Sequence, residues 1–145
     1  MEVLDRKMKE KKSDEKVLLL VGDLGEIANN SVGLMDSLIA KISEYTSLGL
    51  IPIFYTLRPS YDVITSQIQE IAPYRLAMPL STKVESSILL GHGGAEKLLE
   101  GEALVVDPHW NHPIPILLPQ CPLSEKEQFY HSFESDYSKA SRKAS

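Results

Sequence analysis

The sequence predicts one α/β domain with a mostly parallel sheet flanked by helices, and three observations support this. Two continuous apolar runs, Val17–Val21 and Leu50–Thr56, have the length and composition of strands buried in a parallel sheet. Between them, apolar residues recur at helical spacing from Val32 to Tyr45. Alternating strands and helices are typical of parallel strands joined by covering helices. The 145 residues, of which 43% are apolar, suffice for a single buried core.

The chain divides into three parts by composition. Residues 1–15 are predicted to form a charged arm or helix, and residues 16–121 the α/β core. Residues 122–145 are predicted to form a C-terminal helix and a frayed tail. That helix begins at a capping box, Ser124–Glu127, and ends near Phe133.

Further elements of the core follow from caps, glycines and apolar spacing. Asn29–Ser31 is predicted to cap the first core helix, which closes at Gly49. A third strand, 75–80, is expected to extend the parallel sheet. The remaining predicted elements are a helix over 61–71, a helix from the Thr82–Glu85 capping box to Leu90, a short helix over 95–99, and a terminal β-hairpin of strands 103–107 and 113–118.

The charge distribution argues against strong autonomous DNA binding. The chain has a net charge of −5, and residues 17–121 contain five lysines and arginines against eleven acids. Binding to a DNA backbone depends on Lys and Arg that displace counterions. Residues 1–16 are richer in bases, but acids are interleaved with them, so we favour a solvated helix over a nucleic-acid patch.

The cysteine, the histidines and the apolar runs indicate no specific catalytic or metal-binding chemistry. Cys121 is the single cysteine, so the sequence predicts a reduced, cytoplasmic setting. No apolar run is long enough to span a membrane, and no secretory signal is evident. His109 and His112 could ligate zinc, but further ligands are not evident, and we favour a solvated turn with no metal.

Three segments carry a family resemblance. They are Arg58–Thr65 (RPSYDVIT), Pro73–Arg75 (PYR) and Gly93–Leu99 (GGAEKLL). Together they resemble the C-terminal half of the motor domain of the FtsK/SpoIIIE family of DNA translocases, with the pattern RPS-x-DVIT, P-x-R and GAE-x-LL. A looser likeness covers residues 17–118. The resemblance implies a partial RecA-like P-loop NTPase fold, ATP-dependent DNA translocation, and a role in chromosome partition or cell division.

The phosphate loop of such a motor is missing from the sequence. A P-loop reads G-x-x-x-x-G-K-[ST], and its backbone N–H groups and lysine hold the phosphates. The nearest segment, Gly91–Leu98, has Glu96 in place of the second glycine and Leu98 in place of Ser or Thr. In the family this loop lies upstream of the matched region. The resemblance therefore implies ATP and Mg²⁺ as cofactors only where a partner supplies the loop.

The metal-binding element of the motor is also altered. The family reads roughly L-V-D-E-F-A-D-L where this chain has Leu20–Ile27. Gly22 then replaces the metal-binding Asp, and Asp23 replaces the catalytic Glu. Asp23 remains a candidate catalytic residue and Glu26 a candidate nucleotide-binding residue. The alternative, which we favour, is that both carboxylates cap the following loop, because hard cations need several oxygen ligands.

Four further residues are candidates by resemblance. The family pattern A-T-Q-R-P-S aligns with Tyr55–Ser60, where Leu57 replaces the amide that senses phosphate. Thr56 and Arg58 remain nucleotide-site candidates, and Arg58 could instead contact a neighbouring subunit or form an ion pair with Asp62.

Arg75 and Lys83 are retained from the family and are candidates for DNA or subunit contact. Their alternatives are a structural arginine at a strand start and a solvated lysine in a first helical turn. The family's lysine in the helix after DVIT is Gln69 here, and a further family arginine is Ser87.

Three hypotheses for function follow. The first is a truncated motor segment without autonomous ATPase activity, whose partner is an FtsK-like P-loop subunit or a second copy of itself. The second is a non-enzymatic interaction module on a RecA-like scaffold. The third is a fragment of an active ATP-dependent translocase. Under all three, contact with DNA is expected to be weak.

Overall fold

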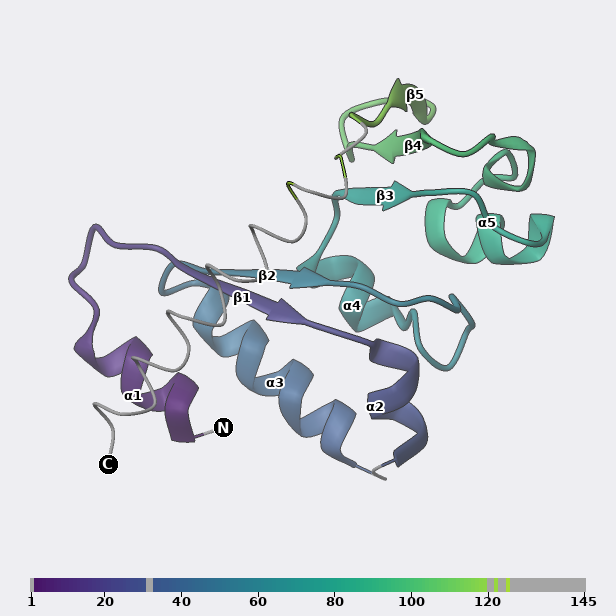
Figure 1. Ribbon diagram of the computed structural model, residues 1–145. Coiled ribbons are helices and arrows are strands. Elements are labelled where there is room, and N and C mark those ends of the chain that lie inside the picture. The colour runs from purple at the N-terminus through teal and green to yellow at the C-terminus, as the bar shows by residue number, and fades with distance from the viewer. Residues whose placement is uncertain (1, 31–32, 120–121, 123–124, 126–145) are drawn as a thin grey trace.

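A computed structural model describes residues 2–30 and 33–119, together with residues 122 and 125. It confirms an α/β protein in which helices and strands alternate through the first half of the chain (Figure 1). The elements in chain order are α1 (Glu2–Glu10), β1 (Val17–Val21), α2 (Leu24–Asn30), α3 (Leu34–Thr46), β2 (Leu50–Phe54), α4 (Ser66–Ile71), β3 (Arg75–Ala77), α5 (Lys83–Leu90), the 3₁₀ turn η1 (Ala95–Lys97), β4 (Glu102–Val106) and β5 (Ile114–Leu117).

The parallel strand pair predicted at the start of the core is confirmed. β1 and β2 pair in parallel, with Val17 opposite Leu50 and Val21 opposite Phe54. The connection differs from the prediction, because Leu24–Asn30 is the separate helix α2 rather than a loop. At the end of α3 the chain reverses through Gly49, whose φ of 93° lies in the left-handed region that favours glycine.

The main core lies on one side of the β1–β2 pair. α3 presents Met35, Ile39, Ile42 and Tyr45 at helical spacing, and all four are buried. They pack with buried side chains of the other elements: Met8, Val21, Leu24, Leu50, Val63, Ile64, Ile68 and Ile88. α3 therefore covers one face of the β1–β2 pair, and the opposite face lies outside the core.

The prediction that residues 75–80 extend the parallel sheet was wrong. In the described residues β3 pairs antiparallel with β4, and β4 pairs antiparallel with β5, in a second, three-stranded sheet. α5 and η1 pack against this sheet in a small core of Ala77, Leu90 and Ala95. α4 joins β2 to β3 and packs in the main core, whereas α5 joins β3 to β4 and packs on β3. The hairpin itself was predicted correctly.

Side-chain caps set the starts of two helices. The predicted capping box of α5 is confirmed: Thr82 accepts the backbone N–H of Glu85, and the Glu85 carboxylate accepts that of Thr82. The helix predicted over 61–71 begins only at Ser66, because the Thr65 hydroxyl accepts the N–H of Ile68 and ends the preceding turn.

The charged N-terminal segment packs on the core through α1. The hydroxyl of Tyr45 donates to Asp5 at 2.7 Å, Lys41 lies 3.3 Å from the same carboxylate, and Met8 is buried. The predicted C-terminal helix from Ser124 to Phe133, the tail and Cys121 lie outside the described residues. Among the residues that are described, no helix has both the length and the apolar character to cross a bilayer.

Candidate functional site at the strand ends

The carboxyl ends of β1 and β2 lie side by side, which is where open α/β sheets bind ligands. Backbone hydrogen bonds continue the pairing past the strands: Tyr55 donates to the carbonyl of Val21 and Leu24 donates to that of Tyr55, both at 3.0 Å. A side chain added at Gly25 would lie 3.6 Å from both the Asp23 carboxylate and the Thr56 hydroxyl. The structure thus brings together two of the predicted site residues.

Asp23 caps the helix that follows it. Its Oδ1 accepts the backbone N–H of Gly25 at 3.1 Å, and its carbonyl accepts the N–H of Ile27 at 3.1 Å. Glu26 is exposed in the first turn of α2. No group of three or more possible metal ligands occurs within the described part of the chain. This geometry supports capping by Asp23, although the cap is the start of a helix rather than of a loop.

The Tyr55 ring fills the space next to Gly22. A Cβ atom at Gly22 would lie 1.5 Å from Cε1 of Tyr55 and 2.2 Å from its Cζ. Gly22 has no positive φ, so its backbone does not require glycine. A side chain at this position would need the Tyr55 ring, which is 49% exposed, to turn away. No side chain, including the Asp of the family pattern, fits at Gly22 while Tyr55 keeps this position.

The segment after β2 forms a local turn around Thr56 and Arg58. The Thr56 hydroxyl accepts the N–H of Arg58 at 3.2 Å and contacts its carbonyl at 3.3 Å, which forms a local turn. Leu57 is 83% exposed. Arg58 is exposed, and the ion pairs of the described residues are both made by Lys41. The pKa of Asp62 is lowered mainly by the Ser60 hydroxyl, and Arg58 adds only a weaker through-space attraction.

Arg75 is engaged within the chain. Its Nη1 lies 3.2 Å from the carbonyl of Leu89, at the end of α5, and 3.5 Å from Oε1 of Gln69 in α4. Its Nε is buried without a hydrogen-bond partner. Arg75 therefore joins β3, α4 and α5. Gln69 accepts a hydrogen bond here, whereas the family's lysine would place a second positive charge beside the guanidinium.

Lys83 lies apart from the strand ends. It is the first residue of α5 and is exposed, and its aliphatic stem crosses Gly93, where an added Cβ would lie 3.0 Å from Cγ and Cε. The nearby Glu96 accepts the N–H of Gly94 at 2.6 Å, and this hydrogen bond is the main cause of its lowered pKa. The hydrogen bonds of Arg75 are to Gln69 and Leu89, and the Lys83 stem lies on Gly93, whereas those of Asp23 and Thr56 are local to the strand ends.

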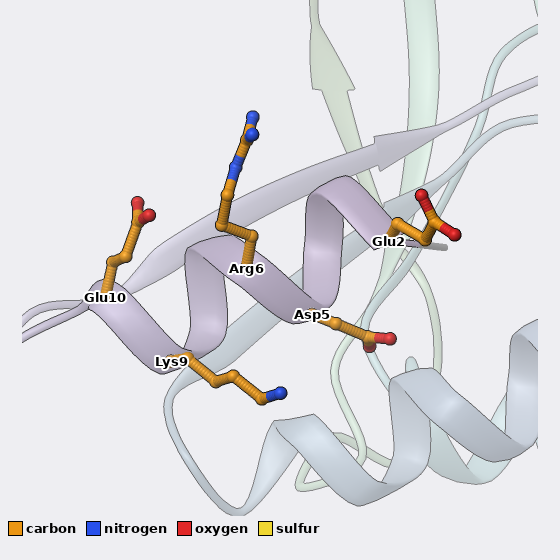
Figure 2. A pocket seen from close by; sticks show the side chains of 5 residues that line it. All are labelled: Glu2, Asp5, Arg6, Lys9 and Glu10. Carbon is orange, nitrogen blue, oxygen red and sulfur yellow. The ribbon is translucent and has the colours of Figure 1, made fainter.

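A hollow on α1 is lined only by charged residues of that helix. Figure 2 shows that Asp5 and Lys9 point toward α3, whereas Arg6 and Glu10 point away from it. The lining has three acids and two bases, and their side chains do not converge on a common point. This surface is the solvated helix face that the sequence predicts, apart from the docking of Asp5 on Tyr45 and Lys41.

The sequence prediction missed the role of Tyr55. The signal was present in the alternation of the strands, because Ile51, Ile53 and Tyr55 lie on the same face of β2 and its continuation, as do Leu18, Leu20 and Gly22 on β1. Extending the strand register by one step places Gly22 opposite Tyr55. His109 and His112, in the turn between β4 and β5, are exposed.

The fold is a partial RecA-like α/β fold, with a parallel strand pair, covering helices and an added antiparallel sheet. Among solved structures, the monomer form of the pCW3 conjugation coupling protein TcpA with ATPgS is similar, with a TM-score of 0.57 and 20% sequence identity. The similarity covers 78% of this chain and 34% of the TcpA chain. The likeness supports the predicted partial RecA-like fold.

The family resemblance is confirmed by sequence. The DNA translocase FtsK of Pseudomonas aeruginosa is 40% identical over 82 residues, which are 55% of this chain and 10% of that protein. FtsK of Treponema pallidum is 30% identical over 124 residues, or 78% of this chain and 16% of that protein. FtsK of Chlamydia trachomatis is 34% identical over 104 residues, or 68% of this chain and 13% of that protein. No protein-family model matches the chain.

This chain is thus similar to a segment of the FtsK DNA translocases. It spans between 10% and 16% of the length of these three relatives.

Proposed function

We propose that this chain is an FtsK-like motor segment without autonomous ATPase activity, which works in the cytoplasm beside a chain that supplies the phosphate loop. The packing of Tyr55 on Gly22 carries the proposal. The ring occupies the space that a metal-binding carboxylate at position 22 would need. ATP hydrolysis in such motors depends on positioned Mg²⁺ and charge stabilisation. The Tyr55 ring fills that space, Asp23 caps a helix, and Leu57 stands at the sensor position. The chain therefore lacks polar groups that ATP hydrolysis needs at these positions.

The partner in this proposal is an FtsK-like P-loop subunit, in keeping with a role in chromosome segregation or cell division. A complementation experiment tests it: the full chain is mixed with a chain that carries a family G-x-x-x-x-G-K-[ST] loop, and DNA-stimulated ATP turnover is measured. We expect turnover of the mixture above that of either chain alone. A mixture no more active than the P-loop chain would contradict the partner role.

Direct DNA binding is expected to be weak. The core is acidic, and Arg75, one of its few bases, is engaged with Leu89 and Gln69. Affinity for a duplex, measured for the full chain at low and at physiological salt, should therefore be weak at both and depend little on salt. A steep fall of a strong affinity with salt would show a phosphate-binding surface and would favour a DNA-tracking motor.

A non-enzymatic interaction module is the second candidate, because one face of the β1–β2 pair exposes Leu18, Leu20, Ile51 and Ile53. Apolar patches on this scale mark interaction sites in soluble proteins. The complementation experiment separates the two candidates: an interaction module binds the P-loop chain, or another protein, without changing its turnover.

A further inference from the structure

Within the described residues, β1 has an edge that no other strand covers, because it pairs only with β2. Val17 donates its backbone N–H across to the carbonyl of Gly49 at 3.1 Å, so its backbone groups point toward β2. In a parallel pair the N–H and C=O of one residue point to the same neighbouring strand, and successive residues alternate. Leu18 and Leu20 therefore turn their N–H and C=O groups to the uncovered edge, where they can pair with an added strand.

The other strand edges of the two sheets carry features that oppose strand addition. β2 contains Pro52 and β5 contains Pro115, and proline has no N–H to give to a neighbour. β3 is only three residues long. Prolines and short edge strands are devices that prevent pairing with another chain. β1 is a five-residue strand without proline or charge, so it has neither device.

A groove runs along the uncovered edge of β1. Its volume is about 460 Å³, and residues from both faces of Val17–Val21 line it, which places it at the strand edge and not over one face. The facing wall is α1, with Val3 and Leu4. α1 contacts α3 through the hydrogen bond between Asp5 and Tyr45, and both helices lie below the β1–β2 pair in Figure 1. α1 thus extends the helical layer past β1, where it can cover one further strand.

The lining of the groove has one charged residue, Lys7 of α1. Lys7 is exposed, and the ion pairs of the described residues are both made by Lys41, so the Lys7 ammonium has no carboxylate partner among them. Apolar walls with a single cation are complementary to an apolar segment that carries one carboxylate. The backbone edge and the groove therefore fit the same occupant, which is an extended apolar segment with an acidic side chain.

We propose that β1 accepts such a segment from a partner chain as a third strand, with apolar side chains in the groove and the carboxylate beside Lys7. Main-chain hydrogen bonds to Leu18 and Leu20 supply affinity in this mode, and the side-chain contacts supply specificity. A motor segment and an interaction module could both use this edge, so the strand addition stands or falls apart from the proposed ATPase role.

Peptide binding to the full chain tests the strand addition. The probe is a fluorescein-labelled peptide of alternating valine and threonine with one central glutamate, and its binding is followed by fluorescence anisotropy. We expect saturable binding that slows hydrogen exchange of the Leu18 and Leu20 amides about tenfold or more, because these amides become hydrogen-bonded. The Leu19 amide, which points toward β2, should change less. No saturable binding, or slowing elsewhere but not at Leu18 and Leu20, would overturn the proposal.

Two N-methylated versions of the peptide separate strand addition from simple apolar contact. One version has its odd-numbered amides methylated and the other its even-numbered amides. Because alternate amides of a strand face the same neighbour, one version should bind about tenfold or more weakly, whereas the other should keep its affinity. Equal affinities of the two versions would contradict a strand at this edge.

A matched pair of lysine substitutions tests the charge. Lys7→Gln should weaken binding of the peptide about twofold to fivefold, as expected for an exposed ion pair. Lys12→Gln removes an exposed lysine that does not line the groove and should leave the affinity unchanged. An equal effect of the two substitutions would overturn the assignment of an acidic partner segment.

Other occupants of the edge give different results in the same experiment. Leu18 and Leu20 amides that are already protected in the free chain, at any dilution, would show that the chain covers its own edge. Protection that disappears on dilution would show that a second copy covers it. Either result overturns the proposal of a partner segment.

Discussion

Gly22 and Tyr55 define the strand-end site at the scale of single residues. The ring of Tyr55 and the missing side chain of Gly22 depend on each other, because a Cβ at Gly22 would lie 1.5 Å from the ring. In the family pattern the same two positions hold an Asp and a small Ala. The two replacements are sterically complementary. A single change back to Asp at position 22 would therefore not recreate a metal ligand unless Tyr55 moved.

Gly22→Ala tests this pair. We expect it to lower the free energy of unfolding by about 0.5–1 kcal/mol, because the added methyl group displaces the half-exposed Tyr55 ring from its position. Adding Tyr55→Ala should recover most of that loss, as measured by urea unfolding of both single variants and the double variant. Gly25→Ala is the matched control: the nearest atoms are 3.6 Å away, so helix propensity should leave it neutral or stabilised. Strict additivity of the Gly22 and Tyr55 changes would contradict the steric pairing.

At the scale of elements, Arg75 holds β3 between α4 and α5. Its guanidinium contacts Gln69 and the carbonyl of Leu89, and its Nε is buried. These contacts give this arginine of the family pattern a structural role within the chain.

Gln69→Lys should destabilise the fold by about 1–2 kcal/mol, because it removes an acceptor and places a second cation beside the Arg75 guanidinium. Gln67→Lys, on the exposed side of the same helix, should stay within about 0.5 kcal/mol of the original chain. Thermal unfolding of both variants measures the difference. An equal effect of the two lysines would show that Arg75 is not coupled to Gln69.

The docking of α1 on α3 should depend on pH through Asp5. The pKa of Asp5 is lowered first by the Tyr45 hydroxyl and then by Lys41. A lowered carboxyl pKa gives stability that is fully present above the unfolded-state value and is lost as the pH falls through the folded-state value. The protection factors of the α1 amides, which are exchange rates divided into the intrinsic rates at the same pH, should therefore fall as the pH drops below about 4, the ordinary range of Asp.

Asp5→Asn should already show low protection factors for α1 at neutral pH and little change of them in the acidic window. Glu10→Gln, which removes an exposed carboxylate from the same helix, should keep the acid dependence of the original chain. An unchanged acid dependence in Asp5→Asn would assign it to another group.

Local patterns predicted the elements better than their pairing. The Thr82 capping box and the β4–β5 hairpin depend on neighbouring residues, so the sequence alone was sufficient for both. The pairing of β3 with β4 depends on where α5 and η1 bury their apolar sides, which periodicity does not specify. The same holds for the site residues. The family resemblance pointed to Asp23 and Thr56, but the packing of Tyr55 on Gly22 depends on the pairing of two strands, which local patterns do not specify.

At the scale of the whole molecule, the chain has a partial RecA-like fold, and its strand ends carry Gly22 and Tyr55 where the family pattern has Asp and Ala. A run of apolar residues in the sequence does not show whether one or both faces of the strand are covered. The exposure of Leu18, Leu20, Ile51, Ile53 and Tyr55 is therefore evident only from the structure. The fold and the altered strand ends together are what the proposed partner-dependent role requires.

The most direct test is ATP turnover by the purified full chain with Mg²⁺ and duplex DNA, compared with its Asp23→Ala variant. The account predicts no turnover above background and no difference between the two proteins, because Asp23 caps a helix and Tyr55 fills the neighbouring metal position. Robust turnover that Asp23→Ala abolishes would show a working catalytic edge and would contradict the account.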